Sequence, residues 1–427
     1  MYQRDKVALI KQRLLEEDNP LIQVVVGPRQ TGKSTMIAQA LDEINGHDGG
    51  GAQNGRIGRT DRDDKNKGKG KDTPVHSVSA DDVLSPDANW IQTEWQQARN
   101  LQARSGTATI LVIGEIQKVK AWPNTVKGLW DADRREQTPL KVCLSGSSSM
   151  LIRKGLEDSL KGRFELIRSP HWTLTECREA FGFTLDDFLF FGGFPGAARF
   201  VNNERRWRDY VRDSIIEPTI TNDVLEQEEV RKPALMRALL ELGTQFSAQE
   251  LSYTKMLGQL QDAGNTTTLA HYLDLLDKAG MLCALDKYDP KLIRSRKSSP
   301  RLMVYDTALM TAMSGRSREL LLNDSELKGY LVESAIGAYL LALSSEHGFS
   351  VQWWREGNYE VDFVLSDRAH LVALEVKSGR MKAQGGMAEF LKRYPKAQRM
   401  IVGGSAPGSC SVEDFLLGQS SLPWLEE

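Results

Sequence analysis

The sequence contains few cysteines and no long apolar run, and each absence excludes a class of protein. Its four cysteines are scattered over 427 residues and show neither a CxxC pair nor the Cys/His spacing of a zinc site, which predicts reduced thiols in a cytoplasmic protein. The longest apolar run has the length of a strand, and residues 1–20 form a charged amphipathic pattern without the apolar core and cleavage site of a signal peptide. We therefore expect neither membrane insertion nor export.

The chain also lacks an excess of either charge. It has 55 Lys and Arg against 57 Asp and Glu, for a formal net charge of −2, so any contact with nucleic acid must come from a local basic patch. Hydrophobic residues make up 40% of the sequence. This is enough to bury a core in each of the two to four domains that the length predicts.

Strands and helices are expected to alternate over residues 1–172. Helical periodicity separates apolar strand patterns at 21–26, 75–80, 108–113 and 141–146. This alternation predicts an α/β fold with a parallel sheet and helices on both faces. Residues 46–73 are rich in Gly, Asp, Lys and Asn. We expect them to form a disordered surface insertion, because they can bury too little apolar surface to become ordered.

Three further segments follow in the sequence. Residues 173–230 have a helical pattern, broken by the turn FGGFPGAA, and are expected to form a helical lid. Residues 231–300 contain two helices, a capped helix and a strand, in the order of a winged helix-turn-helix, and then a basic linker. Residues 301–427 contain a strand, a long helix and three strands in series, which predict another α/β unit.

A phosphate-binding loop lies between the first strand and the next helix. The sequence GPRQTGKST fits the Walker A pattern, whose backbone N–H groups and lysine hold nucleotide phosphates. The sequence therefore predicts ATP as the ligand, with Lys33 on the terminal phosphates and Ser34 holding Mg²⁺. The residues expected to bind this cofactor are Gly27, Gln30, Thr31, Gly32, Lys33, Ser34 and Thr35.

The strand expected to hold the metal ends unusually, in ILVIGEIQ. Hydrolases of this kind place an acidic pair here, the first acid for Mg²⁺ and the second for the attacking water. Glu115 occupies the second position, whereas Gly114 at the first has no side chain to hold a metal. We therefore expect ATP binding with weakened turnover. Asp81 and Asp82, at the end of the preceding strand, either compensate for the missing acid or cap their loop.

Further residues are candidates for the same site. The fourth strand ends in SGSSS, so Ser147 and Ser148 either contact the γ-phosphate or cap the next helix. Arg163 is expected on the same side of the sheet. It either donates to a transferring phosphate, in its own or a neighbouring subunit, or forms a surface salt bridge. A role in a neighbouring subunit would require a nucleotide-dependent homo-oligomer.

The C-terminal strands carry a second set of charged residues, Asp362, Glu375 and Lys377, in the pattern D-x12-E-x-K. Residues two apart in a strand face the same side, so Glu375 and Lys377 point together, and Glu333 on the preceding helix can join them. Asp362 and Glu375 are candidate metal ligands for phosphodiester hydrolysis. The alternative is that these residues are solvated charges or the relic of a nuclease that now only binds.

A basic segment suggests DNA as a partner. The capped helix at 265–280 is followed by five cations, which form either a basic wing or a solvated linker. With the C-terminal unit, residues 265–301 are the candidate DNA-binding surface, and five phosphate contacts predict a log–log salt slope near −4 to −5. The five cations are Lys291, Arg294, Arg296, Lys297 and Arg301.

Several of these motifs together resemble a known prokaryotic family. The stretches VVVGPRQTGKST, ILVIGEIQKVKAWPNTVKGLWD, FGGFPGA and EVDFVL…LEVKSG are similar to AAA-type ATPases that pair an N-terminal AAA_14 module with a C-terminal DUF4143 region. The resemblance implies a P-loop ATPase core with a helical lid, a winged helix and a PD-(D/E)xK nuclease-like domain. Family members usually have DEIQ where this sequence has Gly114-Glu115-Ile116-Gln117. ATP and Mg²⁺ are the cofactors that the resemblance implies.

Overall fold

In the computed structural model, the chain forms two compact units, Met1–Ser169 and Pro170–Glu427. Most of the predicted insertion at 46–73 lies outside the residues that the structure describes, and so does Ser148. The described residues are 1–46, 72–147, 152, 155–156, 159–225, 230–261, 264–290, 299–378, 385–405, 407–420, 422 and 424.

A five-stranded parallel sheet forms the first unit, in the order β2-β3-β4-β1-β5. The sheet confirms the predicted α/β fold class. Its central strands are apolar and buried along most of their length, as a parallel sheet covered on both faces requires. The strands are β1 (Ile22–Val26), β2 (Val75–Ser79), β3 (Thr109–Gly114), β4 (Leu140–Gly146) and β5 (Phe164–Arg168).

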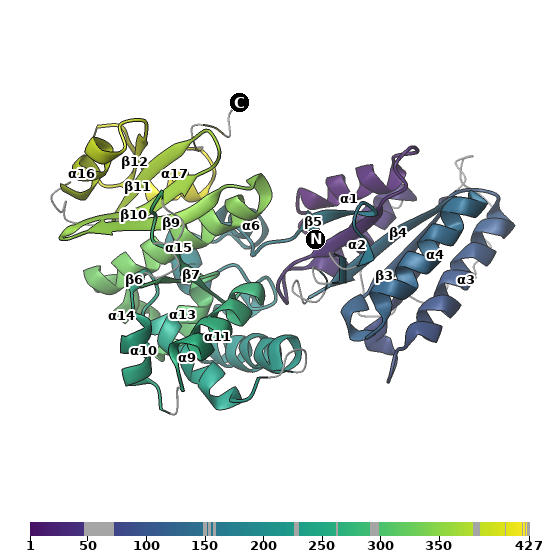
Figure 1. Cartoon of the computed structure of the whole chain (residues 1–427), viewed down its shortest axis with the longest axis horizontal. Coiled ribbons are helices and arrows are strands. Elements are labelled where there is room, and N and C mark those ends of the chain that lie inside the picture. The colour runs from purple at the N-terminus through teal and green to yellow at the C-terminus, as the bar shows by residue number, and fades with distance from the viewer. Residues whose placement is uncertain are drawn as a thin grey trace. The chain divides into compact units, whose positions relative to one another are not determined.

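Helices cover both faces of this sheet (Figure 1). On one face, α3 (Ala88–Ser105) and α4 (Trp122–Glu136) bury a cluster that includes Trp95 and Trp122. On the other face, α1 (Lys6–Leu15) and α2 (Lys33–Ile44) bury a cluster that includes Ile10 and Met36. Short 3-10 turns follow two strands, η1 (Ala80–Asp82) and η2 (Ile116–Lys118). Because all five strands are parallel, their carboxyl ends meet at a single edge.

The second unit begins with the segment predicted as a lid, which is helical. Threonine capping boxes start α6 and α7, since the Thr173 and Thr184 side chains each accept a hydrogen bond from the third residue of the helix. The helices pack against later parts of the same unit. They are α6 (Leu174–Phe181), α7 (Leu185–Phe191), η3 (Ala198–Phe200), α8 (Glu204–Tyr210), η4 (Val211–Ile216) and η5 (Thr219–Leu225).

A small antiparallel sheet follows, in the order β6-β8-β7. Its middle strand, β8, starts at Arg301, so this sheet extends past the domain boundary placed at residue 300 from the sequence. Because β8 pairs with both β6 and β7, residues on either side of position 300 belong to the same sheet. The elements are α9 (Pro233–Gln245), β6 (Gln249–Glu250), α10 (Tyr253–Gln259), α11 (Thr266–Lys278), β7 (Leu282–Leu285) and β8 (Arg301–Val304).

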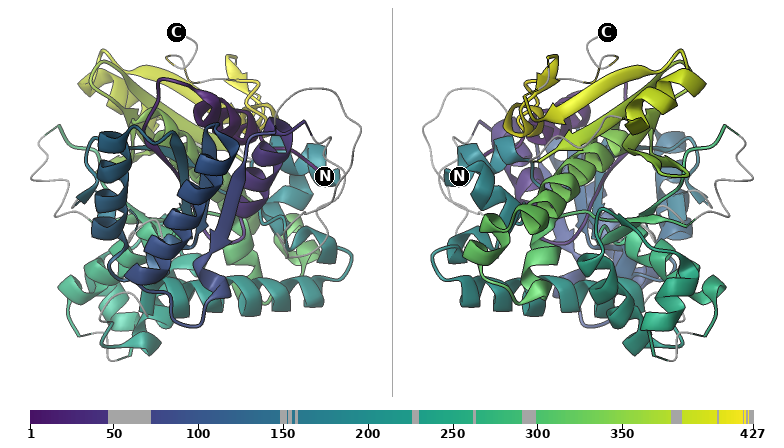
Figure 2. Two further views of the ribbon diagram at one scale, coloured as in Figure 1. Left: turned by 90° about the vertical axis from the view of Figure 1, so that its right-hand side faces the viewer. Right: turned by 90° about the vertical axis from the view of Figure 1, so that its left-hand side faces the viewer.

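A second five-stranded sheet, in the order β13-β12-β11-β10-β9, completes the unit. The long helix α15 packs on one face and α16 on the other (Figure 2). The strands are β9 (Ser350–Glu356), β10 (Tyr359–Ser366), β11 (Leu371–Lys377), β12 (Gln398–Gly403) and β13 (Ser409–Cys410). The helices are α13 (Thr307–Ser314), α14 (Arg318–Asn323), α15 (Ser325–His347), α16 (Gly385–Arg393) and α17 (Val412–Leu416).

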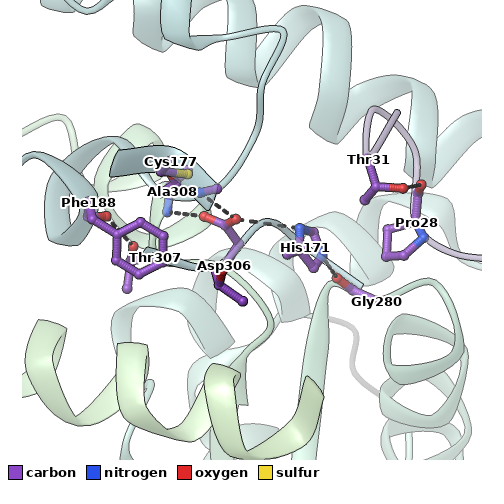
Figure 3. Close-up of polar contacts among 12 residues, drawn as sticks. Pro28, Thr31, His171, Cys177, Phe188, Gly280, Asp306, Thr307 and Ala308 are labelled. Atoms are coloured by element: carbon purple, nitrogen blue, oxygen red, sulfur yellow. Dashed lines mark hydrogen bonds and ion pairs between the residues drawn. The ribbon is translucent and has the colours of Figure 1, made fainter. Parts of the chain in front are cut away.

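The predicted FGGFP turn packs against a buried carboxylate at the start of α13. Asp306 is 4% exposed and accepts hydrogen bonds from the backbone N–H groups of Gly193 (2.8 Å) and Ala308 (2.8 Å). A Cβ on Gly192 would lie 1.8 Å from Asp306 Oδ1, and its φ is +66°. His171 Nδ1 lies 3.4 Å from the same carboxylate (Figure 3). The turn therefore needs glycine both for its conformation and for this contact.

Candidate nucleotide-binding site

The phosphate-binding loop joins β1 to α2, as its sequence predicts. Gly32 has a φ of +87° and Gln30 a φ of +62°, two left-handed residues that curl the backbone into a loop before the helix. A Cβ on Gly27 would lie 2.1 Å from the Ser169 carbonyl oxygen, so only glycine fits there. Lys33 is 6% exposed, and its Nζ donates to the carbonyl oxygens of Gly27 (2.9 Å) and Pro28 (2.7 Å). The loop is therefore held in a curled form by its own lysine.

The loop is also braced from outside by Arg4 and Ser169, which sequence reasoning did not select. The buried Arg4 donates from Nη1 to the Thr31 carbonyl oxygen (3.2 Å) and to Ser169 Oγ (3.0 Å). The Thr31 side chain is fully buried and donates to the Pro28 carbonyl oxygen at 3.0 Å. Thr31 thus shapes the loop from inside, whereas the side chains of Ser34 and Thr35 are exposed at the start of α2.

Glu115 follows β3 directly and has a left-handed backbone, with φ +48°. Its Oε2 accepts hydrogen bonds from Ser147 Oγ (3.0 Å) and from Gln117 Nε2 (2.6 Å). Ser147 follows β4, and β4 lies between β3 and β1 in the sheet. Glu115, Ser147 and the phosphate-binding loop therefore share the carboxyl edge of the sheet, with Ser147 between the other two strand ends.

Gln117 is a second residue that sequence reasoning left out of the site. It is 6% exposed, and a Cβ on Gly146 would lie 2.0 Å from its Oε1. This contact explains the glycine before Ser147. The only signal in the sequence is the Ile-Gln that follows Glu115, and nothing in that pair shows that the amide turns back onto the carboxylate.

Gly114 pairs with Ser79 at the end of β2. A Cβ on Gly114 would meet Ser79 Oγ at 3.1 Å and Ser79 Cβ at 3.4 Å, so a side chain fits once the hydroxyl turns away. Asp81, one of the two acids named above as replacements for the missing one, forms an ion pair with Lys118. Its own backbone N–H donates to Ser79 Oγ at 3.3 Å. The capping side chain of this turn is therefore Ser79, and the Asp81 side chain is engaged by Lys118.

Arg163 lies at the opposite edge of the sheet from the phosphate-binding loop, which differs from its predicted place. It precedes β5, and its carbonyl oxygen accepts from the Ile22 N–H (2.9 Å) at the start of β1. Its Nε donates to Asp131 Oδ1 at 2.8 Å. Because it sits before β5 and not after it, Arg163 cannot reach phosphates on its own loop. Arg168, whose register partner is Val26, is the arginine at the loop edge of β5.

In the second unit, Arg301 sits among three of the C-terminal carboxylates. Arg301 is 5% exposed, and its Nη2 lies 2.9 Å from Glu333 Oε1 and 2.9 Å from Glu360 Oε1. Its Nη1 lies 3.7 Å from Asp362 Oδ1. Burial alone would lower the pKa of Arg301, but the charges of these carboxylates outweigh it and raise that pKa. Glu333 and Asp362 thus come together, as predicted, but around a cation of the chain itself.

Glu375 and Lys377 pair with each other on β11. Glu375 is 7% exposed, and its Oε2 is buried with no hydrogen-bond partner among the described residues. Burial raises the pKa of Glu375, Lys377 lowers it and the charge of Asp362 raises it further. Asp362 Oδ2 accepts from the Val376 N–H at 2.8 Å. Over the described part of the chain, no group of three or more His, Cys, Asp or Glu residues is placed to hold a metal ion.

The predicted basic wing lies largely outside the described residues, since these end at 290 and resume at 299. Arg301, its fifth cation, is buried and occupied by carboxylates, so it cannot contact a DNA phosphate. On α11, Lys278 forms an ion pair with Asp274 at 2.7 Å. The described part of 265–301 therefore carries little free positive charge.

Family models match three parts of the chain. Residues 19–177 match the model AAA_14, described as an AAA domain. Residues 328–408 match DUF4143 and residues 182–320 match DUF8612, both described as domains of unknown function. The DUF8612 match covers most of the predicted lid, the three-stranded sheet and α13.

Curated relatives are distant. An uncharacterized protein of Mycobacterium tuberculosis is 25% identical over 279 residues, which are 64% of this chain and 60% of the relative. The chain thus spans about three fifths of the length of that relative. An uncharacterized protein of Haemophilus influenzae is 20% identical over 387 residues, which are 86% of this chain and 85% of the relative.

One solved structure with some likeness is the Walker-type ATPase PABY2304 of Pyrococcus abyssi, which has 13% sequence identity and a TM-score of 0.49. The match covers 74% of this chain and 96% of that ATPase. AMPPCP-bound DnaA from Aquifex aeolicus has 14% identity and a TM-score of 0.31, covering 65% and 90%. In the described ranges, no helix is long and apolar enough to span a membrane. The family matches thus identify residues 19–177 as an AAA domain of the AAA_14 family and residues 328–408 as a DUF4143 domain, and the chain combines the two.

Proposed function

We propose that this chain binds ATP with Mg²⁺ at the phosphate-binding loop and hydrolyses it slowly, with Glu115 as the general base. The observation that carries the proposal is the common edge of the sheet, where the curled loop, Ser147 and Glu115 end three neighbouring strands. Backbone N–H groups from Gln30 to Thr35 and the dipole of α2 would hold the phosphates. Lys33 would leave the carbonyls of Gly27 and Pro28 for the terminal phosphates.

The residues at this edge fit a nucleotide-bound Mg²⁺ only in part. The exposed Ser34 hydroxyl, at the start of α2, is a suitable oxygen ligand, but Gly114 offers none. The metal, when bound, supplies charge neutralisation for the phosphates. With a single protein ligand it would be held mainly by phosphate and water, so we infer normal nucleotide binding and slow turnover.

Gln117 and Ser147 have a clear task in this proposal. Their hydrogen bonds hold the Glu115 carboxylate at the strand end, where it can accept a proton from an attacking water. Ser147 can also turn its hydroxyl toward a γ-phosphate, which would release one of the two bonds and leave Glu115 freer to meet water. Both residues are positioning residues for Glu115 and not bases themselves.

Calorimetric titration of ATP into the protein tests nucleotide binding. Lys33→Ala should weaken the affinity by about 30- to 100-fold, because two or more charge-assisted hydrogen bonds to phosphate are lost. Lys161→Ala, at an exposed lysine in the turn before β5, should leave the affinity unchanged and controls for a general effect of removing a lysine. Equal affinity of Lys33→Ala and wild type would contradict the proposal.

A nucleotide-dependent homo-oligomer is part of the same proposal. Arg163 is partly exposed at the far edge of the sheet, so it would act only on a nucleotide of a neighbouring copy. Light scattering with and without a non-hydrolysable ATP analogue should then show a larger mass with nucleotide. An unchanged mass would leave Arg163 with its surface pair to Asp131.

Metal-dependent phosphodiester hydrolysis at Asp362, Glu375 and Lys377, with Glu333 alongside, is a second candidate function. What favours it is the buried Glu375 Oε2, which lacks a hydrogen-bond partner among the described residues and lies in the field of Asp362. Such an orphaned carboxylate oxygen is a natural ligand for a hard cation. Arg301 lies among these acids, so DNA and Mn²⁺ should be incubated with Arg301→Gln, which removes that cation, and the cleavage expected there should be abolished by a further Glu375→Gln change. Cleavage that survives this change would contradict the assignment.

DNA binding without cleavage, as a nucleotide-dependent switch, is a third candidate. It would use α11, whose N-cap Asn265 and exposed Thr266 and Thr267 start the helix, together with the cations at 291–297. Because Arg301 is buried, four cations remain and the log–log salt slope should lie between about −3 and −4. A slope near zero in fluorescence anisotropy would remove this candidate.

A further inference from the structure

Arg301 is surrounded by acceptors on every side of its guanidinium. Its Nε donates to the Ala248 carbonyl oxygen (3.0 Å) and its Nη1 to the Asp362 carbonyl oxygen (2.9 Å). Its Nη2 lies 2.9 Å from the carboxylates of both Glu333 and Glu360. A buried arginine with this many partners is fixed in one geometry.

The oxygens that surround Arg301 are those that a divalent cation would need. Mg²⁺ and Mn²⁺ take oxygen ligands at about 2.0–2.2 Å, and Glu333 and Asp362 are the acids that would join Glu375 in such a site. An ion bound to Asp362 Oδ1 would lie within about 6 Å of Nη1, given its 3.7 Å separation from that oxygen and the ligand distance. At that range two cations in a buried site repel strongly.

We propose that Arg301 is an internal cation that holds the carboxylate centre of the DUF4143 domain closed to divalent metal. The positive charge that a metal would contribute is supplied by the guanidinium, and the acids stay paired without an ion. The inference deepens the second candidate function, because it describes how that same centre would be regulated.

The closure is tied to the three-stranded sheet. Arg301 is the first residue of β8, and it pairs in register with Glu250 on β6 and Leu285 on β7. Its side chain then reaches β10 through Asp362 and α15 through Glu333. Because the Arg301 backbone is held by both neighbouring strands, a partner or ligand that displaces this sheet would also carry the guanidinium away from the acids and open the centre.

Binding of Mn²⁺ to the full chain, without nucleotide or DNA, tests the proposal. Wild type should bind no Mn²⁺ at this centre, measured by electron paramagnetic resonance of the free ion. Arg301→Gln should bind one Mn²⁺, at least about tenfold more tightly than the detection limit set by wild type, and adding Asp362→Asn should abolish that binding. Arg301→Gln should also melt about 5–10 °C lower, because buried acids lose their cation, and Mn²⁺ should restore much of that loss.

Arg163→Gln is the matched control, because it removes an arginine that pairs with a carboxylate at the surface. It should change neither Mn²⁺ binding nor the response of Tm to Mn²⁺. If Arg301→Gln does not fold, Arg301→Lys keeps a cation at the centre and should still exclude Mn²⁺. Binding by Arg301→Lys would contradict the proposal, as would a wild-type Mn²⁺ site that Asp362→Asn removes or a folded Arg301→Gln that binds none.

The nuclease candidate can fail while this inference stands. If Arg301→Gln binds Mn²⁺ through Asp362 but cuts no DNA, the centre is a closed cation site without nuclease activity. If wild type cuts DNA with Mn²⁺ and loses the activity in Asp362→Asn, the centre is open in the resting protein and the role given to Arg301 is wrong.

Discussion

The two acidic centres of this chain differ in the charge of the groups that hold their carboxylates. At the edge of the parallel sheet, Glu115 is held by neutral donors, the Gln117 amide and the Ser147 hydroxyl. In the second unit, Glu333 and Asp362 surround the buried guanidinium of Arg301. A carboxylate on neutral donors can exchange one of them for water or substrate at small cost. A buried carboxylate on a fixed cation leaves an unpaired charge when the pair is broken.

Under the proposed function, this difference separates a site suited to turnover from one whose acids are fixed by a buried cation. The same residue type can serve as a base in the first setting and as part of an ion cluster in the second. The sequence pattern does not show whether an acid is held by neutral donors or by a cation, because in both centres the acid lies within an apolar strand or at its end. Matched substitutions in the two centres should therefore have opposite effects on activity and stability.

The largest expected effect is on turnover at the first centre. Glu115→Gln keeps the shape and the hydrogen bond from Ser147 but removes the proton acceptor, so ATP turnover should fall about 10²- to 10³-fold. The affinity for ATP should change by less than about threefold. Steady-state phosphate release and calorimetry, on the same preparation, measure the two quantities.

Glu333→Gln is the crossed control in the second centre. It should leave ATP turnover as in wild type and lower the free energy of unfolding by about 3 kcal/mol, because Arg301 loses a buried charged partner. If Glu333→Gln lowers turnover as much as Glu115→Gln does, the two centres are not separate in function and the comparison fails.

A smaller effect is expected from repairing the strand end. Gly114→Asp would supply the missing first acid, and its Cβ has room once Ser79 Oγ, 3.1 Å away, turns aside. Turnover should rise about tenfold, since a group that positions the metal is worth roughly that factor. Gly114→Ala brings the same Cβ without an oxygen and should give no gain. A gain from alanine would point to backbone stiffening instead of metal binding.

Much of the first unit was predictable from sequence, because its signals are local. The strand pattern, the glycines of the phosphate-binding loop and the acid after β3 each lie within a few residues of the structure they specify. Arg163 was assigned to the wrong edge of the sheet, because its position depends on whether it precedes or follows β5, and the sequence pattern did not reveal that strand. Gln117 was missed because its contact with Glu115 depends on a left-handed turn, which no residue in GEIQ announces.

The second unit was less predictable because its decisive contacts join distant residues. Arg301 belonged to a basic run in the sequence, which was expected to form either a basic wing or a solvated linker, both at the surface. Pairing of β8 with β6 and β7 instead carries it inside, opposite acids 32 to 61 positions further along the chain. The pattern named Glu333 and Asp362 as one group, but Arg301, the cation that lies between them, was assigned to another task.

The smallest expected effect is a pH dependence that sharpens the contrast within the second unit. Burial raises the pKa of Glu375 above its usual 4.5, so folding disfavours its ionised form. Its contribution to stability therefore falls as pH rises through 4.5 and levels off above the folded pKa, and Glu375→Gln should flatten that part of the Tm profile.

Asp367 is the control of opposite sign: a hydrogen bond from His370 lowers its pKa from 3.8 to about 2. Its stabilisation is present above pH 3.8 and is lost as pH falls toward 2, so Asp367→Asn should alter only the acid limb. If Glu375→Gln also alters only that limb, Lys377 outweighs burial and the Glu375 carboxylate is as firmly paired as those around Arg301.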